Sequence, residues 1–386
     1  MRVNRGGQLA LEQILGRDEF VSDLWRELEQ TSVVLTGERR TGKTCVVKKM
    51  HAGRPDGVLS FFQDLEAVHS APELVERMLH CIRPELSRGA RAANVFERVM
   101  ESLGGTEIGG VLKLPDAART EWKQQLPKLV ENLLEHHEGL IVFFWDEFPQ
   151  MLHNVAQDRP EDAMAILDLL RSLRQHHLRL RFVLTGSIGL HAVLTLLQRR
   201  GYRNAPKNDM FTTTLPPLGS EDGVTLARAL LSGEGIAVAD DVQAIAEEIA
   251  NEASCIPFYI HQIVGGMRGR SGVGAGTARR VVDEGLRNAQ DPWELRHYRS
   301  RIDKDYEGED RTYALGLLDT LAASEAPLPF DDLRRRAVAR PKMKDVERLR
   351  AVLRLLEQDH YIARTEDGYE FRTSLIARWW RMERDL

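Results

Sequence analysis

The sequence predicts an α/β fold with a parallel β-sheet in its first 217 residues and a helical region after it. Three apolar runs, at 32–36, 139–145 and 180–184, have the length and composition of buried strands. Amphipathic helical segments lie between these runs, and a glycine-rich loop joins the first run to one of them. Strands that alternate with helices in this way are typical of a parallel sheet covered by helices on both faces.

The composition is that of a globular protein with a sizeable core. The chain has 386 residues, 42% hydrophobic and 29% charged, and this length favours two or three domains. The longest purely apolar run, Leu140–Trp145, is far shorter than the roughly 20 residues that span a bilayer, and no secretory leader is apparent. Three widely spaced cysteines, Cys45, Cys81 and Cys255, fit a reducing compartment. We therefore expect a cytoplasmic protein without a membrane partner.

The first predicted strand leads into a loop that is typical of phosphate binding. The loop consists of Gly37, Glu38, Arg39, Arg40, Thr41, Gly42, Lys43 and Thr44, a full match to GxxxxGK followed by Ser or Thr, and Cys45 begins the next helix. Glycines at both ends allow the backbone N–H groups to point at phosphates. Lys43 neutralises phosphate charge, Thr44 offers a hydroxyl to Mg²⁺, and the helix N-terminus adds partial positive charge. We assign all nine residues to nucleotide binding.

The second predicted strand, 139–145, is continuously apolar and ends in the acidic pair Asp146-Glu147. In nucleotide-hydrolysing proteins, one carboxylate at this place binds Mg²⁺ and another orients or deprotonates the attacking water. We assign Asp146 to the metal and Glu147 to the water. The presence of Glu147 favours hydrolysis over binding alone.

The third predicted strand, 180–184, leads into Thr185-Gly186-Ser187. A small polar side chain at the end of this strand is suitably placed to contact the γ-phosphate or the attacking water. Ser187 is the first candidate for this role, and Thr185 is the second.

In this order, the motifs resemble the P-loop ATPases of the AAA+ superfamily, and most of all the branch of origin-recognition initiators, archaeal ATPases and STAND-type signalling switches. The resemblance spans roughly residues 11–265. The run 14–19 (Ile-Leu-Gly-Arg-Asp-Glu) resembles a box that lies near the adenine and ribose in relatives, which implies that Gly16 and Arg17 contact the nucleotide. The run 256–259 resembles the G-x-P element of the lid, whose proline, here Pro257, backs onto the nucleotide. Cys255 stands where the family has glycine.

The resemblance implies an AAA+ type α/β P-loop core with a parallel sheet, a helical lid and a C-terminal winged-helix domain. Its cofactors would be ATP or ADP with Mg²⁺. An arginine finger would come from Arg199, Arg200 or Arg203, before the predicted strand 211–215, where relatives face a neighbouring subunit's nucleotide. Arg200 is our candidate. The ATP state would then have a protein partner or form a homo-oligomer.

The alternation of strands and helices up to the break at Pro216-Pro217, the helices after it and the element order of the last segment, taken with the resemblance, give the expected domain limits: a P-loop ATPase core at 1–217, a helical lid and linker at 218–290, and a winged-helix domain at 291–386. The lid helices are expected at 220–231, 240–250 and 257–265, with Ser220 and Asp240 as N-caps. The glycine-rich run 265–276 indicates a flexible connection. A small hairpin or loop excursion is expected at 104–115, within the core.

The last segment has the element order of a winged helix: helices at 312–323, 331–338 and 344–358, then strands at 361–365 and 369–372. A basic stretch around its second and third helices would suit duplex DNA: Arg334, Arg335, Arg336, Arg340, Lys342, Lys344, Arg348 and Arg350. However, residues 311–386 contain 15 Lys and Arg against 13 Asp and Glu, a net charge of only +2.

Two functions follow from this reading. In the first, ATP binding and hydrolysis control a winged helix that binds or remodels DNA. In the second, a STAND-like signalling or defence ATPase uses its winged helix to contact protein and not nucleic acid.

Overall fold

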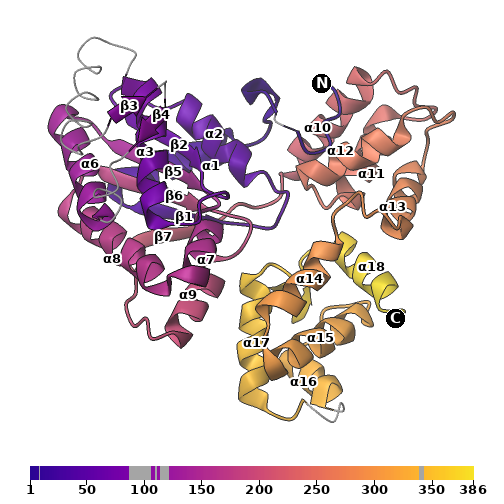
Figure 1. Cartoon of the computed structure of the whole chain (residues 1–386). Coiled ribbons are helices and arrows are strands. Elements are labelled where there is room, and N and C mark those ends of the chain that lie inside the picture. The colour runs from indigo at the N-terminus through magenta and orange to yellow at the C-terminus, as the bar shows by residue number, and fades with distance from the viewer. Residues whose placement is uncertain (8, 87–105, 109–110, 114–120, 339–342) are drawn as a thin grey trace. The chain divides into compact units, whose positions relative to one another are not determined.

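The computed structural model of the chain describes residues 1–7, 9–86, 106–108, 111–113, 121–338 and 343–386 (Figure 1). The chain divides into two compact units. The sheet unit consists of Arg17–Thr36 and Lys43–Leu215. The helical unit consists of Met1–Gly16, Gly37–Gly42 and Pro216–Leu386. Among the described residues, no helix has both the length and the apolar character needed to cross a membrane.

The sheet unit is built on five strands in the order β2-β5-β6-β1-β7, and all of their pairings are parallel. The strands are β1 (Ser32–Thr36), β2 (Leu59–Asp64), β5 (Ile141–Asp146), β6 (Leu180–Thr185) and β7 (Met210–Thr214). The three predicted buried strands form the centre of the sheet, which confirms the expected parallel α/β core. Strand β2 was not predicted; its mixed sequence Leu-Ser-Phe-Phe-Gln-Asp lies at an edge of the sheet.

Helices cover both faces of this sheet (Figure 1). They are α1 (Asp18–Gln30), α2 (Lys43–Ala52), α3 (Ala71–Leu86), α6 (Trp122–His136), α7 (Phe148–Asp158), α8 (Pro160–His176) and α9 (Leu190–Arg199). Successive side chains of a strand point to opposite faces. Val142 and Phe144 of β5 therefore join the core formed with α1 and α2, whereas Phe143 and Trp145 join the core formed with α3, α6, α7 and α8. All six residues of β5 are buried, which explains its continuous apolar run.

A short hairpin lies between β2 and β5 in the chain. Strands β3 (Thr106–Ile108) and β4 (Val111–Lys113) pair antiparallel, with Ile108 opposite Val111. This pairing confirms the hairpin expected within 104–115. Residues 104–105, 109–110 and 114–115 lie outside the described residues.

The helical unit encloses one continuous apolar core that extends from Leu218 to Trp380. Its elements are a 3₁₀ helix (Leu11–Gln13), α10 (Ser220–Gly233), α11 (Val242–Glu252), α12 (Pro257–Met267), α13 (Thr277–Arg287), α14 (Arg296–Asp305), α15 (Gly308–Ala322), α16 (Phe330–Val338), α17 (Val346–Gln358), β8 (Ile362–Arg364), β9 (Tyr369–Phe371) and α18 (Ser374–Glu383). The succession α15, α16, α17, β8 and β9 has the element order expected of a winged helix. Helices α13, α14 and α18 were not predicted.

Both expected N-caps of the lid helices are wrong by one residue. Ser220 is the first residue of α10, and its N-cap position is Gly219. Helix α11 is capped by Asp241, whose carboxylate accepts a hydrogen bond from the backbone N–H of Gln243 at 3.0 Å. Asp240 instead accepts from the N–H of Ala275 at 3.0 Å, so its side chain fixes the loop before α13.

The expected flexible connection at 265–276 is also wrong in part. Gly265 and Gly266 belong to α12, and a Cβ on Gly266 would lie 2.5 Å from Cγ1 of Val281. Val273 is fully buried and forms a bridge with Val238. Gly266 therefore permits close packing of α12 against α13, and the sequence alone does not distinguish a glycine used in this way from a glycine in a linker.

The buried His261 of α12 generates a prediction about acid stability. Its Nδ1 accepts the backbone N–H of Asn4 at 3.0 Å, and burial lowers its pKa from 6.5 to about 4. The imidazole binds a proton more tightly in the unfolded chain than in the folded one. Its contribution to the free energy of unfolding is therefore fully present above pH 6.5 and is lost as the pH falls toward 4. We expect His261→Gln to reduce the difference in unfolding free energy between pH 7.5 and pH 4.5 by about 2 kcal/mol, measured by urea titration.

The matched control is His80→Gln, which replaces an exposed histidine of α3. This variant should keep the pH dependence of the wild type. An unchanged pH dependence in His261→Gln would contradict a buried neutral imidazole.

Candidate nucleotide-binding site

The phosphate-binding loop, Gly37–Gly42, joins β1 to α2. Gly37 and Gly42 have φ angles of 152° and 99°, which glycine adopts far more readily than other residues. Arg40 also lies in the left-handed region, with φ of 70°. Lys43 is the first residue of α2 and is buried, and Thr44 follows it. The loop therefore has the tight curl that its sequence predicts.

Thr44 and Asp146 meet in the sheet unit. The Thr44 hydroxyl donates a hydrogen bond to Oδ2 of Asp146 at 2.5 Å, and the backbone N–H of Glu147 donates to Oδ1 at 3.1 Å. Asp146 is only 3% exposed. Burial raises the pKa of its carboxyl, and the Thr44 hydrogen bond opposes this shift. The site thus presents a hydroxyl oxygen and a buried carboxylate at the carboxyl end of β5.

These donors fit a magnesium ion. Mg²⁺ prefers oxygen ligands and is usually held by one or two carboxylates together with substrate phosphates and water. Among the described residues, no group of three or more His, Cys, Asp or Glu side chains could hold a metal by itself. Thr44 and Asp146 supply two oxygen ligands of the kind that Mg²⁺ binds together with phosphates and water.

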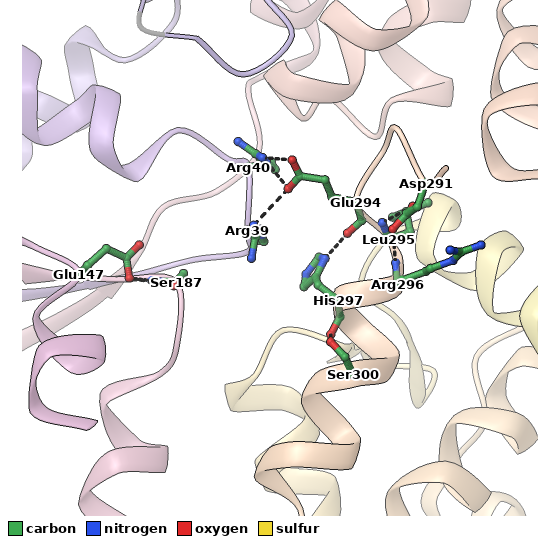
Figure 2. A network of polar contacts seen from close by, with 10 residues as sticks. All are labelled: Arg39, Arg40, Glu147, Ser187, Asp291, Glu294, Leu295, Arg296, His297 and Ser300. Carbon is green, nitrogen blue, oxygen red and sulfur yellow. Dashed lines mark hydrogen bonds and ion pairs between the residues drawn. The ribbon is translucent and has the colours of Figure 1, made fainter. Parts of the chain in front are cut away.

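Glu147 is held in a strained conformation beside Ser187. Its φ of 54° lies in the left-handed region, which costs a non-glycine residue on the order of 1 kcal/mol. Its Oε2 accepts hydrogen bonds from the backbone N–H and the hydroxyl of Ser187, at 2.9 and 2.8 Å (Figure 2). Burial raises the pKa of Glu147, and the two Ser187 hydrogen bonds oppose the shift. Strain of this kind is concentrated at functional sites.

A close approach between the turn Thr185-Gly186-Ser187 and the start of α7 fixes the pair Glu147 and Ser187. Glu147 occupies the N-cap position of α7, a helix that was not predicted, and Pro149 lies in its first turn. A Cβ on Gly186 would lie 2.7 Å from Cδ of Pro149, so only glycine fits there without rearrangement. The Thr-Gly-Ser turn therefore needs its glycine to bring Ser187 to Glu147. Thr185, the second candidate, is 2% exposed, and its hydroxyl has no hydrogen-bond partner in the described part of the chain.

The other predicted residues lie as follows. Gly16 has a φ of 62°, and a Cβ there would lie 2.4 Å from Cγ of Asp222. Arg17 is 4% exposed, and its charge partly opposes the rise that burial causes in the pKa of Cys45. The Arg200 guanidinium donates to the carbonyl oxygen of Ala156 near the end of α7.

Pro257 begins α12, two residues after Cys255, which stands where the family that the sequence resembles has glycine. Cys255 has a φ of 53°, and its carbonyl oxygen accepts the N–H of Leu218 at 3.0 Å. The cysteine therefore adopts the left-handed backbone that glycine would favour, and the turn before α12 is formed despite the substitution.

Two residues that bind the phosphate-binding loop within the helical unit were not predicted from the sequence. Glu38, which is 2% exposed, accepts a 2.6 Å hydrogen bond from the hydroxyl of Tyr298. The carboxylate of Glu294 pairs with both Arg39 and Arg40 (Figure 2). Tyr298 and Glu38 are 260 positions apart in the chain. No local pattern connects residues at such a separation.

The described part of the basic stretch is largely occupied by ion pairs. Arg334 pairs with Asp331, Arg335 with Asp332, Arg348 with Glu309 and Asp310, and Arg350 with Glu347. Arg340 and Lys342 lie outside the described residues. Four of the eight basic side chains therefore have an acidic neighbour that a DNA phosphate would have to displace.

No protein-family model and no curated protein sequence matches the chain. Among solved structures, the Walker-type ATPase of Pyrococcus abyssi is 16% identical with a TM-score of 0.64, over 98% of this chain and 99% of that chain. The ORC2 protein of Aeropyrum pernix in its ADP form is 13% identical with a TM-score of 0.45, over 98% and 96%. A STAND protein with a tetratricopeptide repeat sensor from Pyrococcus horikoshii is 13% identical with a TM-score of 0.38, over 98% and 43%. The first likeness, with the five-stranded parallel sheet, confirms the predicted α/β P-loop fold with a parallel sheet; at this identity it concerns the fold alone.

The left-handed conformation of Cys255 generates a prediction about stability. Cys255→Gly removes the Cβ that disfavours this conformation, whereas Cys255→Ala keeps it. We expect the glycine variant to be more stable than the alanine variant by about 1 kcal/mol, measured by urea unfolding. Equal stabilities, or a more stable alanine variant, would contradict a left-handed residue at this position.

Proposed function

We propose that the protein is a Mg²⁺-dependent ATPase that acts as a molecular switch. One observation carries this proposal: Thr44, Asp146, Glu147 and Ser187 form a single hydrogen-bonded group at the carboxyl ends of β5 and β6, beside the start of α2. ATP or ADP binds on residues 37–45, where the backbone N–H groups and Lys43 neutralise the phosphates. Gly16, Arg17 and Pro257 are further nucleotide contacts in this proposal.

Thr44 and Asp146 are the residues that hold the metal in this proposal. Mg²⁺, when bound, supplies positive charge that neutralises the phosphate oxygens during transfer. Asp146 is already desolvated by its position at the end of β5, so its carboxylate interacts strongly with a cation placed next to it. The Thr44 hydroxyl keeps the carboxylate in one orientation through its 2.5 Å hydrogen bond.

Glu147 is the proposed base that receives a proton from the attacking water. A carboxylate whose pKa is raised by burial is a stronger base than an exposed one, which suits this role. Ser187 fixes one oxygen, Oε2. In this proposal the other oxygen, Oε1, receives the proton from water. In this arrangement Ser187 positions Glu147, in addition to the proposed contact with the γ-phosphate.

An arginine finger from Arg200 belongs to the same proposal, together with a homo-oligomer or another protein partner in the ATP state. Arg200 now donates to the carbonyl oxygen of Ala156. To reach a neighbouring subunit's nucleotide, its guanidinium would have to leave this carbonyl oxygen.

The switch acts on the C-terminal segment, which we propose to be a winged helix. The ion pairs of Arg334, Arg335, Arg348 and Arg350 favour the function in which this segment contacts protein over the function in which it binds DNA. Acidic neighbours reduce the positive potential that attracts the DNA backbone.

We expect Glu147→Gln to bind ATP with the affinity of the wild type and to hydrolyse it at least 100-fold more slowly, because the amide cannot accept a proton.

Lys43→Ala should lose ATP binding, because the phosphate charge is no longer neutralised. Steady-state phosphate release and calorimetric titration with MgATP measure the two effects. Glu135→Gln, which changes an exposed acid of α6, is the control. Hydrolysis by Glu147→Gln at the wild-type rate would refute the assignment.

We also expect duplex DNA to leave the rate of ATP hydrolysis unchanged at 50 mM and at 200 mM salt. Binding through many phosphate contacts would weaken by orders of magnitude between these salt concentrations. Stimulation that disappears at the higher concentration would support the DNA-binding function instead. In that case, the basic side chains of the stretch would be the residues to substitute.

A further inference from the structure

The loop that precedes α14 has a fixed shape that presents Glu294. Asp291 and Glu294 both have left-handed backbones, with φ of 49° and 56°. The Asp291 carboxylate accepts the N–H groups of Leu295 and Arg296, at 2.8 and 2.9 Å, and so stabilises the turn that leads into α14 (Figure 2). Two residues in strained backbone conformations, held by such contacts, indicate that these contacts and not the residues' own conformational preferences fix the shape of the loop.

The Glu294 carboxylate binds two arginines of the phosphate-binding loop. Nε and Nη2 of Arg40 donate to its two oxygens, with the Nε bond at 3.1 Å, and Nη2 of Arg39 donates at 3.1 Å. The Arg40 guanidinium also lies over the ring of Phe258, 4.5 Å from its centroid. Hydrogen bonding to Arg40 lowers the pKa of Glu294, so the carboxylate stays ionised at neutral pH.

A second, buried contact fixes the same loop. Glu38 accepts the Tyr298 hydroxyl at 2.6 Å, and both side chains are almost fully buried. The backbone carbonyl of Tyr298 in turn accepts the hydroxyl of Tyr361 at 2.7 Å, just before β8. Three consecutive residues of the phosphate-binding loop, Glu38 to Arg40, are thus held by α14 and the loop before it.

Carboxylate and phosphate bind a guanidinium in the same bidentate way. Arg39 and Arg40 lie between the two glycines of the loop, so a polyphosphate bound there places negative charge next to both. A guanidinium that is paired with Glu294 is not free to pair with phosphate. The ion pairs are partly exposed, with side chains 27% to 40% accessible, so water screens them and the competition is modest.

We propose that Glu294 and Tyr298 position the phosphate-binding loop, and that the Glu294 carboxylate competes with the nucleotide's phosphates for Arg39 and Arg40. This inference rests on the proposed function. In this proposal Glu294 lowers the affinity for ATP. The phosphates of ATP have to replace the Glu294 carboxylate as the partner of the two arginines, and the loop before α14 then loses these ion pairs. By thermodynamic linkage, whatever moves α14 away from the loop raises the affinity for ATP.

The experiment compares MgATP affinity by calorimetry in the wild type and in Glu294→Gln, which keeps the size of the side chain and removes its charge. We expect the variant to bind ATP about 3- to 10-fold more tightly. The matched control is Glu284→Gln, which breaks the ion pair of Glu284 with Arg270 in the same unit, away from the phosphate-binding loop. Its affinity should equal that of the wild type.

A double-mutant cycle separates competition from a merely structural effect. Arg40→Gln should lower ATP affinity at least 3-fold in the Glu294→Gln background and clearly less in the wild type, where the lost phosphate contact is offset by the loss of the competing pair with Glu294. A structural role alone would change the melting temperature without this non-additivity. Thermal unfolding of each variant shows whether its fold is retained.

An ATP affinity of Glu294→Gln equal to or weaker than that of the wild type, with an unchanged melting temperature, would overturn the competition while leaving the ATPase proposal intact. A wild type that binds no ATP would overturn the proposed function itself. Tighter binding by Glu294→Gln together with additive effects of Arg40→Gln would also overturn the proposal, because the gain would then not depend on this arginine.

Discussion

The burial of β5 is the constraint on which the sheet unit depends. Its side chains alternate between two apolar cores, so helices cover the strand on both faces and only its carboxyl end remains for ligands. Asp146 is the last residue of this strand and is therefore desolvated before any ligand binds. A buried carboxylate is costly unless hydrogen-bond donors or a cation compensate it. Thr44 and the Glu147 N–H supply part of this compensation, and a metal ion would supply the rest.

Backbone strain is found in two groups of polar residues, one in the sheet unit and one in the helical unit. Glu147 adopts a left-handed conformation next to Asp146, and so do Arg40 and Glu294 in the other group. Each of these residues is held by hydrogen bonds or ion pairs that outweigh its local preference. A protein selected for stability alone would favour glycine at such positions.

The parts of the site that depend on neighbouring residues in the chain could be predicted from the sequence. The phosphate-binding loop needs its glycines and lysine at fixed spacing, and β5 needs a continuous apolar run, so both leave local patterns. The strand β2 and the N-cap of α11 leave weaker patterns. Strand β2 carries polar residues at a sheet edge, and either of two adjacent aspartates can cap α11. Glycines packed within α12 have the same composition as a linker.

The contacts of Glu294 and Tyr298 with the phosphate-binding loop leave no pattern at all. They join residues more than 250 positions apart, and neither residue lies in a motif. Such contacts are determined by how the helical unit packs, which no short window of sequence contains. The sequence therefore predicted the local geometry of the phosphate-binding loop and of the buried strand that ends in Asp146, whereas the contacts that hold this loop became visible only in the folded chain.

The central claim is that Asp146 holds the metal and that Glu147 acts on water. Electron paramagnetic resonance of Mn²⁺, used in place of Mg²⁺, tests this division of roles directly in the presence of ATP. The account predicts that Asp146→Asn weakens Mn²⁺ binding at least 10-fold, whereas Glu147→Gln binds the ion as tightly as the wild type. Equal losses in the two variants, or an undiminished Mn²⁺ affinity in Asp146→Asn, would contradict it.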